Sequence, residues 1–180
     1  MDRAISDLDL LVAEHVAEQG GTVIKARGEG DSHFAVFHRA SDAIVACCNL
    51  QRALRTALSD VALAVRASVH SAEIEPRDSD YFGGPLGHAA RLRSAAHGGQ
   101  IVVSRVAADL ARARLPDDVE LRSLGTHRLR DWGMQEIFQV YAPGLHTVFP
   151  QLNASSDRSR LMTGRICGRS RLYAPLNTLR

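Results

Sequence analysis

The sequence has few of the residues that mark disulfide-rich, metal-binding or membrane proteins. Its 180 residues include three cysteines and one tryptophan, and aromatic residues make up 5% of the chain. Cys47 and Cys48 are adjacent and Cys167 is distant, a spacing that favours buried free thiols over a disulfide or zinc site. No apolar run approaches the roughly 20 residues that span a bilayer, and the N-terminus lacks the apolar core of a signal peptide. We therefore expect a cytoplasmic protein without a membrane partner.

Positive charge is unevenly distributed along the chain. Residues 1–150 contain 16 Lys and Arg against 19 Asp and Glu, whereas residues 151–180 contain six Arg against one Asp. An arginine-rich end of this kind can bind nucleic acid through its phosphates. Tyr173 is the only aromatic residue there, so the aromatic interleaving of a nucleic-acid surface is missing. Nucleic acid is therefore a third hypothesis and not the expected partner.

The hydrophobic pattern predicts an α+β fold in which helices cover a mainly antiparallel sheet. We expect one domain over residues 1–145 and a basic, flexible tail over residues 146–180, where the pattern decays. The expected helices cover residues 4–18, 42–58, 86–96 and 104–114, with Ser41 and Ser104 as caps, and the expected strands cover residues 22–26, 32–37, 61–70, 72–75, 101–103 and short stretches near residues 120, 127 and 138.

A glycine-rich turn joins the first two expected strands and presents one carboxylate, Asp31, at its tip. A carboxylate in such a turn can hold a divalent cation, because Mg²⁺ takes a few carboxylate oxygens and completes its shell with water and phosphate. An aspartate in a hairpin can equally bond its own backbone. From the turn alone, the second interpretation is favoured.

Further segments give this turn a context. Residues 78–83 (Asp-Ser-Asp-Tyr-Phe-Gly) and 89–93 (Ala-Ala-Arg-Leu-Arg) follow in order, and then come residues 95–104 and 125–130. Together with the turn, they resemble the class III adenylate/guanylate cyclase catalytic domain, of the bacterial type found at the N-terminus of large ATPase and helix-turn-helix regulators. The resemblance covers roughly residues 4–145.

The resemblance implies a ferredoxin-like, palm-type antiparallel sheet and a site built where two domains pair head-to-tail. In the family, Mg²⁺ or Mn²⁺ ions help convert ATP to cyclic AMP and pyrophosphate, which makes the enzyme a phosphorus-oxygen lyase. The expected partners are ATP or another purine nucleotide and a second cyclase domain, identical or different. The matching positions are Asp31 for a metal ion, Arg27 and Asp80 for reading the purine, Arg91 for the transition state, Arg130 for phosphate, and Gly87 where the family has a transition-state asparagine.

One strand of the family is missing from the sequence. In the family, a central strand that bears the first metal aspartate precedes the opening helix, and this chain begins with that helix. Asp7 and Asp9 lie within the helical pattern and are interpreted as solvated residues. The missing strand would pair with residues 32–37, so a central edge of the sheet would stand open. Three alternatives stay open: the true start lies upstream, a partner donates a strand, or the sheet closes differently.

The resemblance therefore implies a truncated and degenerate cyclase domain. Loss of one oriented donor to a developing oxyanion costs ~2.7–4 kcal/mol, or about 10²–10³ in rate, and loss of a metal carboxylate adds to it. We expect weak or absent turnover. The alternative hypothesis is a non-catalytic pseudo-cyclase that serves as a dimerisation or nucleotide-sensing module in signalling.

Overall fold

The computed structural model describes residues 2–24, 32–57, 64–73, 76–77, 80–81, 84–153, 155–156 and 171–179. Only the backbone is described for residues 2–4, 76–77, 80–81, 155–156 and 171–179. The helices are α1 (Asp2–Glu18), α2 (Ala40–Ala57), α3 (Gly84–Ala95), α4 (Arg105–Ala111) and the 3-10 helix η1 (Arg112–Arg114). The strands are β1 (Thr22–Ile24), β2 (Ser32–Phe37), β3 (Ala64–Ala72), β4 (Pro76–Arg77), β5 (Asp80–Tyr81), β6 (Ile101–Ser104), β7 (Glu120–Leu129), β8 (Gly133–Tyr141), β9 (Ser155–Ser156) and β10 (Arg171–Leu179).

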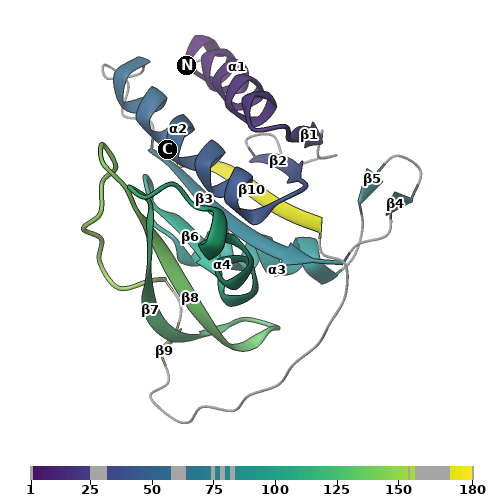
Figure 1. Cartoon of the computed structure of the whole chain (residues 1–180), viewed down its shortest axis with the longest axis vertical. Helices are drawn as coiled ribbons and strands as arrows, with labels where there is room; N and C mark the ends of the chain where they lie inside the picture. Colours follow the sequence, from purple (N-terminus) through teal and green to yellow (C-terminus); the bar gives the residue numbers. More distant parts are fainter. Residues whose placement is uncertain are drawn as a thin grey trace.

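Eight of these strands form one twisted sheet, in the order β1-β2-β10-β3-β6-β8-β7-β9 (Figure 1). The pair β3 and β6 is parallel because α3 crosses over between them, and the other pairs of this sheet are antiparallel. Strands β4 and β5 form a separate small hairpin. The predicted α+β class with a mainly antiparallel sheet is confirmed. No helix in the described part of the chain is long and apolar enough to cross a membrane.

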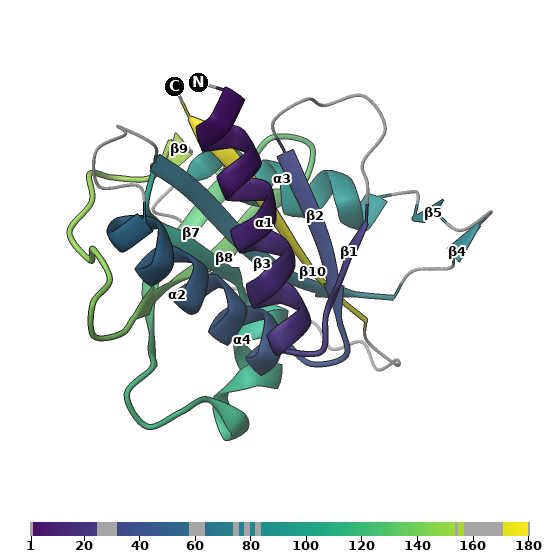
Figure 2. The ribbon, with the colours of Figure 1, turned by 90° about the horizontal axis from the view of Figure 1, so that it is seen from above.

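Alternate residues of β2 show which helices cover which face of the sheet. Ala35 and Phe37 belong to the main core cluster, which includes residues of α1, α2 and α4. Phe34 lies between them in sequence and packs instead against Ala89 of α3. Since successive side chains of a strand point to opposite faces, α1, α2 and α4 cover one face and α3 the other, an arrangement visible from above in Figure 2.

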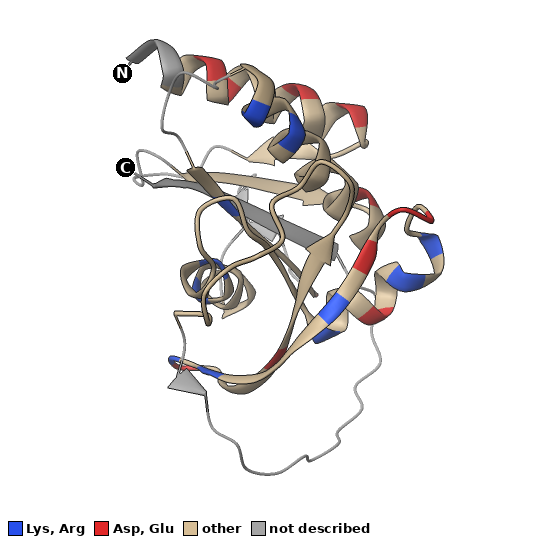
Figure 3. Cartoon of the chain, turned by 90° about the vertical axis from the view of Figure 1, so that its left-hand side faces the viewer, with Lys and Arg blue, Asp and Glu red and all other residues tan. Residues whose placement is uncertain are grey.

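Helix α1 is attached to the sheet by its apolar stripe and by one polar contact. Leu8, Val12 and Val16 are buried at helical spacing. Acidic residues also lie along this helix (red in Figure 3). The carboxylate of Asp9 is exposed and accepts a hydrogen bond of 2.7 Å from Nε2 of His33 on β2. Asp9 therefore ties helix to sheet and is more than the solvated residue that the helical pattern predicts.

Cys47 and Cys48 are buried free thiols on α2, as predicted. Burial raises the pKa of Cys47 far above its usual range and that of Cys48 to about 11. Because the thiolate is the reactive form, both cysteines are chemically inert in the folded chain.

Ser104 caps α4 as predicted, accepting a hydrogen bond from the backbone N–H of Ala107. The end of the domain differs from the prediction of three short strands. It forms one long hairpin, β7 and β8, and the register shifts between Ser123 and Thr126. Gly125 lies within this irregularity with a φ of 88°. Gly125 thus permits a bulge inside a single strand, where two short strands were predicted.

The strand β10 occupies the middle of the sheet, between β2 and β3 and antiparallel to both. Leu176, for example, lies opposite His33 on one side and Ala67 on the other. This is the place beside residues 32–37 that the resemblance leaves open. The structure fills it from the C-terminal end of the same chain (yellow in Figure 1). Residues 171–179 lie in the segment that composition assigned to a flexible tail, while the domain boundary at residue 145 stays a prediction.

Removal of residues 171–180 is expected to abolish the cooperative unfolding of the chain. The strand comprises nine residues, of which six pair with β2 and seven pair with β3. A net backbone hydrogen bond contributes about 1 kcal/mol, and a domain of this size has only about 5–15 kcal/mol in total. Thermal melting followed by circular dichroism measures the effect.

A synthetic peptide of residues 170–180 added to the truncated chain should restore the melting transition. The matched control is the same peptide with Leu176→Pro, which lacks the backbone donor at a position paired on both sides. A truncated chain that melts like the full chain would contradict the placement of β10.

Candidate functional site

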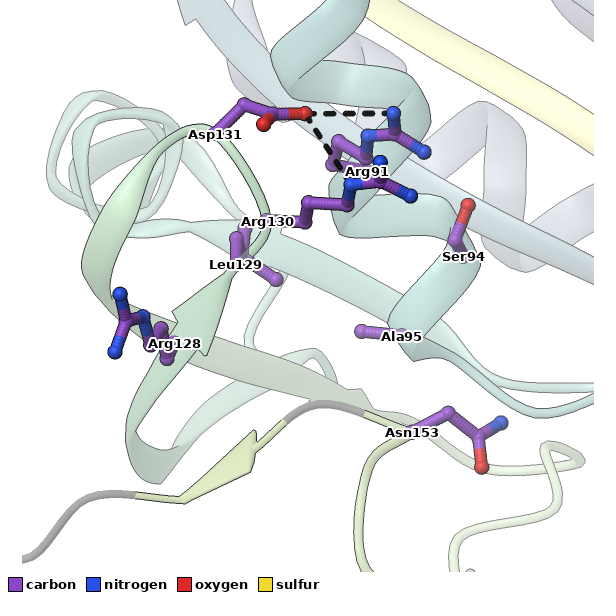
Figure 4. A pocket seen from close by; sticks show the side chains of 8 residues that line it. All are labelled: Arg91, Ser94, Ala95, Arg128, Leu129, Arg130, Asp131 and Asn153. Atoms are coloured by element: carbon purple, nitrogen blue, oxygen red, sulfur yellow. Dashed lines mark hydrogen bonds and ion pairs between the residues drawn. The ribbon is translucent and has the colours of Figure 1, made fainter.

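A polar cavity of about 520 Å³ lies between the second half of α3 and the turn that joins β7 to β8. It opens to solvent and is lined by three arginines, of which Arg91 and Arg130 point toward Asp131 and Arg128 lies apart from them (Figure 4). Ser94 from α3 and Asn153 from the segment before β9 add neutral polar groups. The lining residues are Arg91, Ser94, Ala95, Arg128, Leu129, Arg130, Asp131 and Asn153.

Two of the predicted site residues meet in this cavity. Arg91 comes from α3 and Arg130 from the β7–β8 turn, and both face the carboxylate of Asp131 (Figure 4). The Arg91 guanidinium donates to Oδ2 of Asp131 at 3.4 Å, and Nε of Arg130 lies 3.9 Å from the same oxygen. All three side chains are exposed, so each ion pair contributes at most about 1 kcal/mol to stability.

Gly87 lies one helical turn before Arg91, where the resemblance implies a lost asparagine. The Trp132 indole covers this part of α3. A Cβ atom added at Gly87 would lie 3.8 Å from Cζ2 of Trp132, and one added at Gly84 would lie 3.1 Å from Cη2. The space into which an asparagine amide would extend is therefore bordered by an aromatic ring.

Behind the indole lie two buried histidines in contact with each other. The His88 ring is parallel to the Trp132 indole with centroids 4.6 Å apart, and its other neighbour is the His70 ring at 4.2 Å. Nδ1 of His70 shares a hydrogen bond of 2.9 Å with the Ser104 hydroxyl. Burial, with a smaller contribution from His88, lowers the pKa of His70 to about 3, and burial also lowers the pKa of His88. Both rings are therefore neutral, which allows them to lie in contact without repulsion.

The side chains of three other predicted site residues are not among those that the structure describes. Arg27 and Asp31 lie outside the described residues, and Asp80 belongs to β5, where the backbone alone is described. Among the residues whose side chains are described, no group of three or more His, Cys, Asp or Glu could hold a metal ion. The described part of the chain thus offers no metal centre, and a Mg²⁺ or Mn²⁺ ion stays a prediction that depends on Asp31.

Sequence reasoning missed Asp131 as a member of the site. This residue has a φ of 70° in the turn between β7 and β8. Aspartate is one of the few non-glycine residues that adopt this conformation readily. The sequence Arg130-Asp131-Trp132-Gly133 therefore signals a tight turn, but nothing local indicates that the turn lies against α3.

No protein-family model matches the chain. The uncharacterized protein Rv0891c of Mycobacterium tuberculosis (strain H37Rv) is 40% identical over 158 residues, which are 87% of this chain and 54% of that protein. The uncharacterized protein Rv1359 of the same strain is 33% identical over 147 residues, 78% of this chain and 57% of that protein. The chain spans about half the length of the curated relatives it matches.

Several solved structures with a similar fold are cyclase domains. An adenylate/guanylate cyclase/hydrolase from Silicibacter pomeroyi has a TM-score of 0.68 and 22% identity, over 79% of this chain and 85% of that chain. An adenylate cyclase from Trypanosoma brucei has a TM-score of 0.65 and 18% identity, over 84% and 83%. The guanylate cyclase domain from Catenaria anguillulae, solved with GTP, has a TM-score of 0.58 and 13% identity, over 76% and 81%. At these identities the likeness establishes the fold.

The stability of the chain is expected to fall as the pH is lowered from about 6.5 to about 3, because of His70. In the unfolded chain this histidine takes up a proton near pH 6.5, whereas the folded chain resists protonation down to about pH 3. Each pH unit in this window lowers the free energy of unfolding by up to about 1.4 kcal/mol. Urea unfolding at pH 7 and pH 5 should differ by about 2 kcal/mol from this residue alone.

The variant His70→Asn keeps a polar partner for Ser104 and should lose most of this pH dependence. The control is His38→Asn at an exposed position, which should keep the acid slope. An unchanged slope in His70→Asn would show that other groups cause the acid destabilisation.

Proposed function

We propose that this chain, which has the fold of adenylate and guanylate cyclase catalytic domains, binds a purine nucleoside triphosphate and turns it over weakly or not at all. The proposal rests on the fold and on the arginine-lined cavity. It also rests on two groups of the family's site that have no counterpart here: the transition-state asparagine, where this chain has Gly87, and the first metal aspartate, since β10 carries no Asp or Glu. It treats Arg91 and Arg130 as phosphate-binding residues.

The observation that carries the proposal is the contrast between Arg91 and Gly87. The two residues are four apart on α3, so they lie on the same side of the helix. Arg91 offers donors that suit phosphate oxygens, but Gly87 offers no side chain where the family places an amide. The Trp132 indole beside Gly87 has a single N–H group, and the atom of the indole nearest to a Cβ built at Gly87 is a carbon. Binding is thus supported while a donor to the transition state is missing, which costs about 10²–10³ in rate.

The sequence of β10 supports the same conclusion. This strand takes the place of the family's first strand, yet residues 171–179 contain no Asp or Glu. At the start of β2, next to the residue predicted to bind metal, β10 places Asn177 opposite Ser32. An amide oxygen is a weaker ligand than a carboxylate for Mg²⁺, since it carries no net charge. A site that depends on two carboxylates is therefore not completed by this strand.

The proposed partner, besides the nucleotide, is a second copy of this chain or another cyclase domain. The resemblance implies head-to-tail pairing, in which residues such as Arg91 act on a nucleotide held partly by the other domain. Because this chain has fewer catalytic groups than the family's site, it would act as the nucleotide-sensing or supporting member of such a pair.

Addition of ATP is expected to raise the melting temperature of the purified chain, whereas cyclic AMP should form at a rate barely above background. The assays are thermal shift and chromatographic detection of product, each with Mg²⁺ or Mn²⁺. Rapid cyclic AMP synthesis by this polypeptide would contradict the proposed weak turnover.

The variant Arg91→Ala is expected to weaken ATP binding about 10–100-fold, since hydrogen bonds to charged groups contribute about 1.5–3 kcal/mol. The control Arg114→Ala removes the same charge from an exposed position on η1, away from the cavity. Equal losses in both variants would indicate non-specific attraction and would count against the site.

A further inference from the structure

Asp131 has the position of an anion bound by the two arginines of the cavity. Its Oδ2 atom faces the guanidinium groups of both Arg91 and Arg130. We propose that the Asp131 carboxylate acts as an internal anion that occupies Arg91 and Arg130 in the free chain, so that only ligands with two or more linked phosphates displace it efficiently. This inference rests on the proposed nucleotide site and concerns its selectivity.

The geometry of the two ion pairs makes Asp131 displaceable. The contact to Arg91 is a long hydrogen bond of 3.4 Å, and the contact to Arg130, at 3.9 Å, is an ion pair without a hydrogen bond. The Asp131 side chain is 64% exposed, so water screens both contacts. One carboxylate oxygen is shared by the two guanidinium groups, so each of the two ion pairs is weak.

A chain of phosphates fits the same two cations better. Each guanidinium presents a planar fork of donors that pairs bidentately with phosphate oxygens. Two linked phosphates carry separate sets of oxygens, so each arginine can bind its own phosphate instead of sharing one atom. A single phosphate offers little that the carboxylate does not already supply, and it therefore competes poorly with Asp131.

The charges of the residues that line the cavity also favour a ligand with several negative charges. Among the described residues that line it, three are arginines and one, Asp131, is acidic. Once Asp131 swings away, the lining has a formal charge of +3 and further polar groups in Ser94 and Asn153. The Asp131 carboxylate thus sets the charge of the free cavity, and a ligand binds both arginines only if it interacts with them more strongly than this carboxylate does.

The turn allows the charge to be removed without disturbing the backbone. Asp131 has a positive φ, a conformation that asparagine also adopts readily. Asp131→Asn therefore preserves the turn and the side-chain shape while it removes the negative charge. Trp132, the only tryptophan of the chain, follows directly and stacks on His88, so its fluorescence reports on rearrangement of this turn.

The test measures binding of inorganic tripolyphosphate, pyrophosphate and orthophosphate to the full chain at fixed ionic strength, by calorimetry and tryptophan fluorescence. Asp131→Asn is expected to bind tripolyphosphate about three- to tenfold more tightly than the wild type, because one to two weak ion pairs no longer compete. Orthophosphate binding should rise by a similar factor, because each ligand has to displace the same carboxylate.

The matched control is Asp118→Asn. Asp118 is 54% exposed and forms a similarly long ion pair, 3.7 Å, with Arg52 outside the cavity. It changes the net charge by the same amount, so general electrostatic attraction would strengthen binding equally in both variants. That result, or unchanged tripolyphosphate binding in Asp131→Asn, would overturn the inference.

The same titrations separate this inference from the proposed function. If Asp131→Asn shows the expected gain for tripolyphosphate but ATP does not bind, the internal-anion role is supported and the nucleotide function fails. If ATP binds with an Arg91-dependent affinity that Asp131→Asn leaves unchanged, the nucleotide function stands and the internal-anion role is overturned. If neither ATP nor tripolyphosphate binds, both are overturned.

Discussion

Backbone pairing in the centre of the sheet is the constraint on which the rest of this molecule depends. Strands β2 and β3 each have an edge whose N–H and C=O groups need partners once helices cover both faces. Strand β10 supplies partners to both. Its Pro175 lacks an N–H group and lies opposite Phe34, so the ladder tolerates one missing donor. By holding β2 and β3 at a fixed separation, β10 also gives α3 a continuous surface on which to lie.

The position of α3 determines the chemistry of the cavity. Arg91 projects from this helix toward the β7–β8 turn, and Trp132 from that turn lies over Gly84 and Gly87. The two glycines at the start of the helix leave the space that the indole uses. The same turn therefore presents a cation, Arg130, an anion, Asp131, and an aromatic ring, Trp132, to α3.

Local features were predictable from the sequence. The helices α1 and α2 follow from apolar spacing, and the start of α4 follows from Ser104, because helix periodicity and capping depend on residues a few positions apart. Strand β7 was harder to predict, because a glycine such as Gly125 is typical of an interruption in a strand. Only the pairing with β8 makes this position a bulge within one strand. Arg91 and Arg130 could be proposed from their motifs, whereas Asp131 could not, because its role depends on a helix 40 residues away.

The sequence by itself determined which groups the chain possesses: the four-residue spacing of Gly87 and Arg91, and a last segment that contains no carboxylate between residues 171 and 179. Only the tertiary structure decided that this last segment lies between β2 and β3 and that Asp131 faces two arginines. The reason is physical. Side-chain chemistry and local periodicity are carried by neighbouring residues, whereas strand pairing across about 140 positions is decided by which edges need partners once the whole chain has folded.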